Sequence, residues 1–365
     1  MKTGGLRRPA ALPVVSLLAA ALLLAACGSG GAGGGSAGGG ERVLNVFNWS
    51  EYLPDSVLAA FEAEFGVRVN YDVYSSNQEL MAKLQAGGQG LYDVAVPSDF
   101  TAATMIELGL VEPLDFDRLP NVTQYLVDDL RDPVYDPGGR YTVPYMWGTT
   151  GLAYNTAQVG KEITDWADIF DPAFEDRILL LDDMPEVMAI GLWMNGLDPS
   201  STDPADIEAA RRTLEELMPL VKAFDSDTQS DYLLSGEVWI AQAYSGEAAL
   251  AIMEDPDITY VLPAGGCSYW VDVMVIPAGA PNPDLAHEFI NFLYRPEIAA
   301  QIAEEYPYAT PNGEALSLLS EEVLGNPAAY PPEDQLARCV FLTDPGEASE
   351  LYAEAFTELK LRATE

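Results

Sequence analysis

The alternation of strand-length and helix-length segments is the feature of this sequence that most restricts its fold. Val43–Phe47 is an apolar run of strand length, and Pro54–Phe65 is an amphipathic segment that ends at Gly66. A second strand is expected over Val67–Tyr74, and a second helix over Asn77–Ala86. Strands that alternate with helices in this way predict parallel sheets with crossover helices, and hence an α/β fold.

The same alternation resumes in the second part of the chain. After Trp147-Gly148, strands are expected over Gly151–Tyr154 and Ile178–Leu181, followed by a long helix over Pro204–Phe224 with Asp203 as its N-cap. The roughly 325 residues from Glu41 onward exceed what a single core usually carries. We therefore expect two domains.

The first forty residues are expected to lie outside the fold. Three basic residues precede a short apolar segment, Val14–Ala26, which is typical of a secretory signal over residues 1–26. Its end, Leu24-Ala25-Ala26-Cys27, is similar to the bacterial lipobox, in which the cysteine is acylated and becomes the first mature residue. An ordinary cleaved signal with an incidental cysteine is the alternative. Residues 27–40 are then the lipidated cysteine and a Gly-rich flexible tether.

The chain is strongly acidic, with a net charge of −39 that becomes −42 once the three basic residues of the predicted signal are removed. Such a charge argues against binding to nucleic acid and to anionic lipid surfaces. It is compatible with cationic ligands, but solubility in salty surroundings is the stronger explanation. The charge alone therefore does not identify a function.

Cysteine and histidine usage excludes several kinds of site. With Cys27 assigned to the anchor, Cys267 and Cys339 remain as an even pair in an exported chain and are candidates for a disulfide. The single histidine, His287, is expected on a solvated helix face. No cluster of metal-ligand spacing is present, so we expect no metal, no cofactor and no histidine-based catalysis.

An unusual turn follows the first predicted strand. Trp49, Ser50, Glu51 and Tyr52 place two large rings around a carboxylate, whereas turns are normally small and polar. One explanation is packing, with Trp49 stapling the helix start and Glu51 solvated at its amino terminus. The other is a ligand site, because ligands of open α/β sheets sit beyond the carboxyl ends of strands and between domains.

A second polar cluster follows the strand Ile178–Leu181. Asp183 and Glu186 have the spacing of a capping box at the start of a helix. The same spacing puts both carboxylates on one helix face, where they could point into a cleft. The two interpretations are compatible, because a capping carboxylate has more than one acceptor lone pair.

Two further segments combine rings with carboxylates. In a strand, alternation puts Trp270 and Asp272 on the same face, and a buried carboxylate without a partner is costly. Tyr244 and Glu247 follow another strand. These clusters contain no lysine or arginine, so together they favour a flexible ligand that carries ammonium groups on methylene stems.

Read together, these segments resemble the bacterial spermidine/putrescine-binding proteins that serve ABC importers. The segments that carry the resemblance are VFNWSEYLP (46–54), YDVAVPSDF (92–100), VPYMWGTTGLAYN (143–155), LLLDDMPEVM (179–188), SYWVDVMVIP (268–277) and YATPN (308–312). They span nearly the whole predicted mature chain, in order.

The resemblance implies a type II periplasmic-binding-protein fold, with two α/β lobes that close on a ligand in the interdomain cleft. It implies a first lobe of residues 41–148 plus 271–318 and a second lobe of residues 149–270 plus 319–365. The matched ligand-binding positions are Trp49, Ser50, Glu51, Tyr52, Ser98, Asp183, Glu186, Tyr244, Glu247, Trp270 and Asp272.

Three positions depart from the pattern of spermidine binders. Phe100 stands where a tyrosine is frequent, Tyr244 where a tryptophan is usual, and Leu342 where a glutamine is often found. Glu247, in contrast, matches a position that is acidic in putrescine binders. The preferred polyamine therefore stays open.

The resemblance implies a non-enzymatic receptor that delivers spermidine, putrescine or both to the permease of an ABC importer. It would be an extracytoplasmic monomer, held at the membrane through its lipid anchor only. Two alternatives remain at this point. The same fold could bind an amino acid, a sugar or ferric iron, or the paired acids could belong to a secreted glycosidase.

Overall fold

The computed structural model describes residues 42–88 and 90–364 and has a mixed α/β architecture. The strands are β1 (Arg42–Trp49), β2 (Val67–Tyr74), β3 (Val94–Ala95), β4 (Val143–Asn155), β5 (Ile178–Leu180), β6 (Val221–Phe224), β7 (Ile240–Tyr244), β8 (Ile258–Val261), β9 (Cys267–Met274) and β10 (Cys339–Val340).

The α-helices connect these strands and cover the sheets. They are α1 (Asp55–Phe65), α2 (Asn77–Lys83), α3 (Asp99–Glu107), α4 (Pro120–Tyr125), α5 (Thr156–Val159), α6 (Met184–Met194), α7 (Pro204–Glu215), α8 (Gln229–Leu234), α9 (Ser245–Glu254), α10 (Pro283–Leu293), α11 (Pro296–Glu305), α12 (Glu321–Leu324), α13 (Glu333–Leu336) and α14 (Ser349–Arg362).

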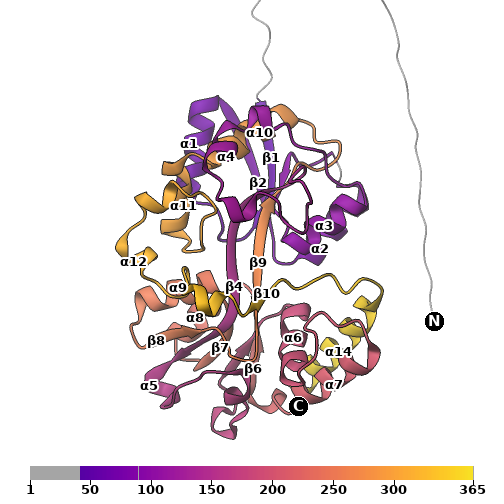
Figure 1. Ribbon diagram of the computed structural model, residues 1–365, viewed down its shortest axis with the longest axis vertical. Coiled ribbons are helices and arrows are strands. Elements are labelled where there is room, and N and C mark those ends of the chain that lie inside the picture. The colour runs from indigo at the N-terminus through magenta and orange to yellow at the C-terminus, as the bar shows by residue number, and fades with distance from the viewer. Residues whose placement is uncertain (1–41, 89, 365) are drawn as a thin grey trace, which may run out of the picture. The chain divides into compact units, whose positions relative to one another are not determined.

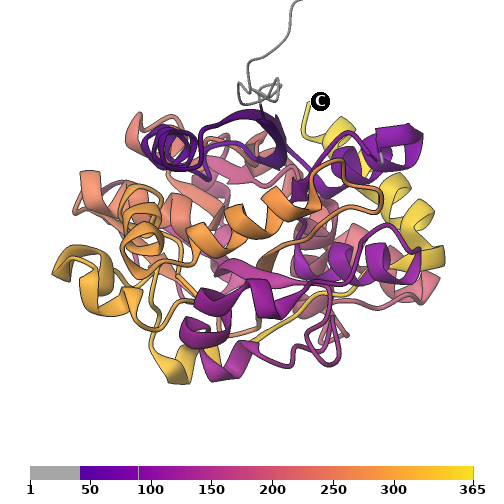
Figure 2. The same cartoon turned by 90° about the horizontal axis from the view of Figure 1, so that it is seen from above.

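The first lobe is built on the parallel strands β2-β1-β3. Antiparallel bridges add the chain after β9 to this sheet, because Val275 pairs with Ala95 and Pro277 pairs with Val111. α1 and α10 pack over the lobe, where the Phe61 ring meets the ring of Phe289 at 4.9 Å. Figure 2 shows α10, in orange, lying across this lobe.

The second lobe repeats the same strand order. β5 is parallel to β6 and to β7, β4 runs antiparallel to β7, and β8 pairs with the other edge of β4. The order β6-β5-β7-β4-β8 therefore corresponds to that of the first lobe, where the antiparallel strand is the segment after β9. In each lobe the fourth position is filled by a strand that arrives from the other lobe.

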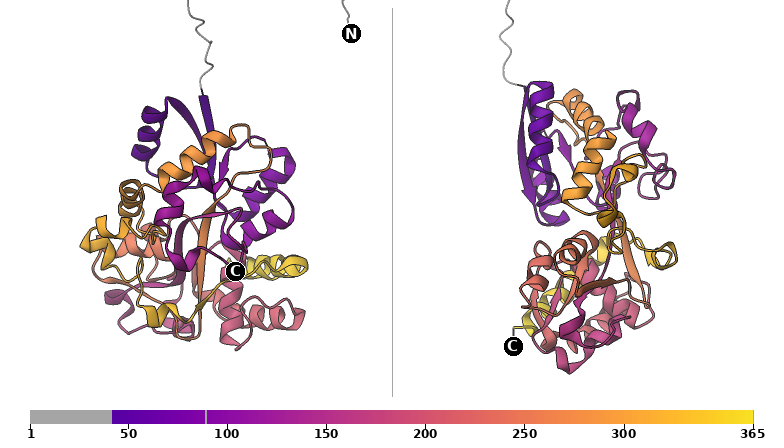
Figure 3. Two further views of the ribbon diagram at one scale, coloured as in Figure 1. Left: turned by 45° about the horizontal axis from the view of Figure 1, so that its top comes forward. Right: turned by 90° about the vertical axis from the view of Figure 1, so that its left-hand side faces the viewer.

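Two long strands join the lobes. The first half of β4 pairs with β9, while its second half lies in the sheet of the second lobe. Figure 1 shows β4 and β9 running side by side from one lobe to the other, and the right-hand view of Figure 3 shows them from the side. Gly148 lies at this crossing, and a Cβ there would be 2.5 Å from Ser245 Oγ and 2.6 Å from the Trp270 ring. Only glycine fits this approach.

The hydrophobic core is also divided between the two lobes. One cluster of buried hydrophobic side chains includes Leu44, Phe61 and Phe289, and another includes Leu180 and Leu214. α14, near the end of the chain, contributes Tyr352 and Leu359 to the second cluster. Each lobe thus has its own core, assembled from segments that are distant in the sequence.

Two sequence-based expectations about local structure are wrong. The helix expected over Pro204–Phe224 ends at Glu215, and Val221–Phe224 forms the edge strand β6. Pro219 cannot continue a helix, and the short segment after it completes the sheet. Asp203 does cap α7, because its side chain accepts a hydrogen bond from the Ala205 amide.

His287 is buried rather than solvated, with 6% of its surface exposed. Its Nε2 accepts a hydrogen bond from the Asp115 amide at 3.0 Å, and its Nδ1 lies 2.7 Å from the Pro283 carbonyl oxygen. A neutral ring with the proton on Nδ1 satisfies both contacts. The histidine therefore ties α10 to the loop before α4, on the inner face of the helix.

Candidate functional site

A cleft between the lobes contains about 910 Å³ of space, part of which is open to solvent. The residues that line it are Trp49, Ser50, Glu51, Tyr52, Ser75, Asn77, Ser98, Asp99, Phe100, Asp183, Pro185, Glu186, Ser226, Asp227, Tyr244, Glu247, Ser268, Tyr269, Trp270, Asp272, Tyr308 and Leu342. The structure thus brings together all eleven residues that the sequence suggested as ligand-binding, from both lobes and from the crossing strands.

The turn after β1 forms the first-lobe wall of the cleft. The Trp49 ring packs on Tyr74 at 4.6 Å, and Tyr52 is buried among Tyr145 and Tyr308. Glu51 is exposed and has a φ of 50°, the left-handed conformation that residues with a Cβ rarely adopt. Both interpretations of this turn therefore hold. The rings pack and fix the backbone, and the Glu51 carboxylate faces the cleft.

Asp272 is the carboxylate that the crossing strand β9 contributes. It is 6% exposed, and its Oδ2 accepts a hydrogen bond from the Tyr52 hydroxyl at 2.6 Å. Its Oδ1 is buried and has no hydrogen-bond partner among the described residues. Burial raises the pKa of Asp272 to about 6. A buried acceptor without a partner is costly, so this oxygen marks a place for a donor from a ligand.

Trp270 lies on the same face of β9 as Asp272, as strand alternation predicts. Its ring stands edge-on to Tyr244 at 5.9 Å and to Tyr308 at 5.6 Å. Its Nε1 is likewise buried without a hydrogen-bond partner among the described residues. The three rings form an aromatic wall next to the carboxylate.

α6 contributes Asp183 and Glu186 from the second lobe. Asp183 is the N-cap, and it accepts hydrogen bonds from the Glu186 amide at 3.4 Å and from the Tyr244 hydroxyl at 3.0 Å. Glu186 accepts hydrogen bonds from the hydroxyls of Thr150, at 3.0 Å, and Ser268, at 2.7 Å. Only half of the capping box expected from the sequence forms, because the Glu186 side chain turns to these hydroxyls instead of the N-cap amide.

Burial perturbs both of these acids. It raises the pKa of Glu186 to about 8, with the nearby charge of Asp183 adding to the effect. It also raises the pKa of Asp183 above its ordinary value. The carboxylates are thus poorly solvated in the cleft, a state that a bound cation would relieve.

Glu247 lies in the first turn of α9 and is buried, with 6% of its surface exposed. It accepts hydrogen bonds from the backbone amide of Ser230 at 3.0 Å and from its hydroxyl at 2.7 Å. Burial raises its pKa. This carboxylate is held in one position by α8.

Sequence reasoning missed several lining residues. Asp99 caps no turn of its own but accepts a hydrogen bond from the Val271 amide at 2.8 Å, and burial raises its pKa to about 8. Tyr308 and Asp227 were also missed. The signal for Asp99 was its place directly after Ser98 at a strand end, and Tyr308 lay within the segment YATPN. Asp227 had no signal beyond a polar loop.

The charged side chains that line the cleft are all acidic. Among its lining residues are seven carboxylates, Glu51, Asp99, Asp183, Glu186, Asp227, Glu247 and Asp272, and none is lysine, arginine or histidine. Seven aromatic rings accompany them, from Trp49, Tyr52, Phe100, Tyr244, Tyr269, Trp270 and Tyr308. This set suits a cationic ligand with apolar stems and lacks any charged partner for an anion.

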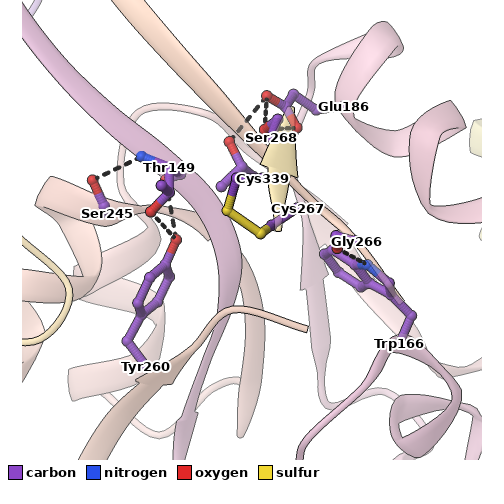
Figure 4. Close-up of a disulfide and its surroundings, with 10 residues drawn as sticks. Thr149, Trp166, Glu186, Ser245, Tyr260, Gly266, Cys267, Ser268 and Cys339 are labelled. Carbon is purple, nitrogen blue, oxygen red and sulfur yellow. Dashed lines mark hydrogen bonds between the residues drawn. A yellow bond between two sulfur atoms is a disulfide. The ribbon is translucent and has the colours of Figure 1, made fainter. Parts of the chain in front are cut away.

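The structure joins Cys267 and Cys339 in a disulfide. The bond links β9 to β10, and Figure 4 shows it beside Ser268 and the Glu186 carboxylate. In the described part of the chain, no group of three or more histidine, cysteine or acidic side chains is placed to hold a metal ion.

The predicted lipidation site, Cys27, and the tether lie outside the described residues. Within residues 42–88 and 90–364, no helix is long and apolar enough to cross a membrane.

Comparison with solved structures identifies the fold as that of the type II periplasmic binding proteins. A structure described as a putative spermidine/putrescine ABC transporter from Listeria monocytogenes superposes with a TM-score of 0.84 at 38% identity, covering 88% of this chain and 99% of the other. The expected fold class is confirmed.

Residues 56–331 match the family of bacterial extracellular solute-binding proteins, and the chain belongs to this family. The spermidine/putrescine-binding periplasmic protein of Escherichia coli K12 is 38% identical over 318 residues, which cover 87% of this chain and 91% of the relative. The putrescine-binding periplasmic protein PotF of the same organism is 32% identical, covering 88% and 92%. Family membership makes the chain an extracytoplasmic solute-binding protein and excludes the glycosidase.

Proposed function

We propose that this protein is a receptor that captures a polyamine, spermidine or putrescine or both, and delivers it to the permease of an ABC importer. The observation that carries the proposal is the unpartnered Oδ1 of the buried Asp272, set in a cleft with seven carboxylates and no basic lining residue. The names of the relatives, which refer to spermidine and putrescine, support the same class of ligand.

The carboxylates and rings would divide the work of binding. An ammonium group donates to Asp272 Oδ1, and each hydrogen bond to a charged group contributes about 1.5–3 kcal/mol. Glu51 supplies a counter-charge from the first lobe, while Tyr52 orients Asp272 through its 2.6 Å hydrogen bond. Trp49, Tyr244 and Trp270 enclose the methylenes, each of which contributes about 0.8 kcal/mol when buried.

Capture would occur by closure of the two lobes, with residues 41–148 plus 271–318 as the first and residues 149–270 plus 319–365 as the second. The only long strands shared by the lobes in the described chain are β4 and β9, so rotation would be concentrated there. A cation held by acids from both lobes favours the closed form, because it removes the repulsion between them.

The amino terminus would keep this receptor at the membrane. A diacylated Cys27 and the Gly-rich tether of residues 28–40 would hold a monomeric body on the outer side of the cell membrane, free to reorient. Expression of the full chain and its Cys27→Ala variant, followed by detergent phase partition, tests this part. Wild-type protein is expected in the detergent phase and the variant in the aqueous phase.

Isothermal titration of the purified protein with putrescine, cadaverine, spermidine, spermine and agmatine tests the ligand class. At least one of them is expected to bind with a Kd in the micromolar range or below, and arginine, glucose and ferric citrate are expected to give no heat. The absence of heat from every polyamine at micromolar protein would overturn the proposal.

A further inference from the structure

The segment of residues 339–344, here called the strap, lies along the outer edge of the crossing strands. Its first two residues form β10, which pairs in parallel with β9 so that Cys339 stands opposite Cys267 and Val340 opposite Ser268. The disulfide between Cys267 and Cys339 makes this pairing covalent. The strap then leads to α14.

Both ends of the strap are attached to the second lobe. Upstream, the Asn326 side chain donates to the Ala249 carbonyl oxygen of α9. Downstream, the Thr343 amide donates to Ser200 Oγ at 3.0 Å, and α14 packs into the core of that lobe. The strap therefore belongs to the second lobe in any position of the hinge.

The strap also contacts the first lobe. The Thr104 hydroxyl of α3 donates to Asp344 Oδ2 at 2.9 Å. The Phe341 ring meets Tyr269 at 4.8 Å and Tyr135 at 6.3 Å. The contacts with Thr104 and Tyr135 connect the strap to the first lobe without passing through β4 or β9.

The strap also forms part of the cleft. Leu342 lines the cleft and is 8% exposed, three residues after Cys339. On the other side of the disulfide, Ser268 directly follows Cys267 and donates to Glu186 at 2.7 Å. The disulfide thus lies between Leu342, an apolar residue of the cleft wall, and Ser268, whose hydroxyl orients Glu186. Figure 4 shows Ser268 and Glu186 beside the disulfide.

We propose that the Cys267–Cys339 disulfide is a positioning element of the binding site, which holds Leu342 as a fixed wall and thereby sets the length of ligand that fills the cleft. The inference rests on the proposed function for its ligand. Without the bond, only the two paired residues of β10 and the ring contact between Phe341 and Tyr269 hold the strap to β9, and a two-residue pairing is weak. Leu342 can then move, which enlarges the cleft. A short diamine does not fill the added space, whereas a longer polyamine can occupy it.

The first test measures selectivity in a double-mutant cycle. The Kd values for putrescine and spermine are compared in wild type, Leu342→Ala, Cys267→Ser with Cys339→Ser, and the combination of all three. Leu342→Ala is expected to weaken the binding of putrescine about tenfold and that of spermine less than about threefold. The disulfide variant is expected to change the ratio in the same direction, and the combination to equal Leu342→Ala alone.

A matched control separates positioning from stability. Val323→Ala removes buried side-chain volume from a cluster that does not line the cleft. It is expected to lower the melting temperature and to leave the putrescine-to-spermine ratio unchanged. A disulfide variant that only lowers the melting temperature, with the ratio of wild type, would overturn the inference.

The second test needs no ligand. Hydrogen exchange of the amides of residues 340–344 is expected to be at least about tenfold faster in the disulfide variant, while the amides of α14 exchange as in wild type. Equal exchange in the strap would overturn the inference even if no polyamine binds, an outcome that separately removes the proposed function. If the serine variants do not fold, reduction of the full chain by a phosphine replaces them in both tests.

Discussion

The two lobes hold their carboxylates in different ways. On the second lobe, Asp183, Glu186 and Glu247 each accept two or more hydrogen bonds from neighbouring residues. On the first lobe, Glu51 is exposed at the tip of a left-handed turn, and it accepts no hydrogen bond that the structure records. These three acids of the second lobe are thus preorganised, as is Asp99 of the first lobe through the Val271 amide, whereas Glu51 can adapt to the ligand.

Asp272 stands between these halves, because Tyr52 of the first lobe fixes one of its oxygens and the other is left for the ligand. Asp272→Asn is expected to weaken polyamine binding about 100-fold, through loss of the charge and of an acceptor whose hydrogen bond contributes about 1.5–3 kcal/mol. Titration calorimetry measures the loss. Asp93→Asn, at a buried acid outside the cleft, is the control and is expected to leave Kd within about twofold of wild type.

The preorganised acids make binding depend on pH. A cation needs ionised carboxylates, and burial raises the pKa of Asp272 to about 6 and that of Glu186 to about 8. Protons compete with the ligand below these values, so affinity is expected to rise about 10- to 30-fold between about pH 5.5 and pH 8.5. A Kd that is constant over this range would contradict the prediction.

The stability of the ligand-free protein should decrease as pH rises, whereas its affinity for the ligand increases. Because these folded-state pKa values lie above those of the unfolded chain, the folded state binds more protons, and its stability falls as pH rises from about 4.5 to about 8. Polyamine binding offsets this loss. The shift in melting temperature caused by saturating ligand is therefore expected to grow with pH, which thermal unfolding at three pH values checks.

Glu51, the adaptable acid of the first lobe, should contribute less to binding than Asp272. Glu51→Gln is expected to weaken binding about tenfold at low salt, because the counter-charge is lost from an exposed position. The same substitution should matter less as salt increases, whereas the effect of Asp272→Asn should persist. A salt-independent loss at Glu51 would show that this residue is as desolvated as the acids of the second lobe.

The smallest effect is expected from a supporting residue. Ser230→Ala removes the hydroxyl that donates to Glu247 and leaves the backbone amide in place. Since one of two donors remains, a loss of about threefold in affinity is expected. A tenfold loss would mean that Glu247 contacts the ligand through the oxygen that this hydroxyl orients, and titration calorimetry distinguishes the two outcomes.

Much of the fold could be predicted because the local signals agree with the tertiary structure. β2 has the expected bounds, and α1 ends at Phe65 with Gly66 as its C-cap, as the pattern indicates. The errors arose where tertiary contacts decide. Residues 221–224 form a strand because the sheet offers them an edge, and His287 is buried because the amide of Asp115, outside its helix, supplies a partner for the ring.

The candidate site shows the same limit. Clusters that combine a ring with an acid were visible as local patterns, as at Glu51 and Asp272. Asp227 could be found only from the assembled cleft, since nothing in its own segment distinguishes it from other loop residues, whereas Leu342 was reached through the resemblance to spermidine binders. The orientation of Glu186 toward Thr150 and Ser268, rather than back to its own N-cap, likewise depends on residues 36 and 82 positions away.

The exchange of strands between the lobes has a consequence for how the chain folds. The sheet of the first lobe is complete only when residues 275–277 reach β3, and its core needs α10. During synthesis, therefore, the first lobe cannot finish folding until nearly three hundred residues have been made. Most of the contacts that close this lobe join distant parts of the chain, which makes folding slow. The first lobe thus stays incomplete for most of the time that the chain is being made.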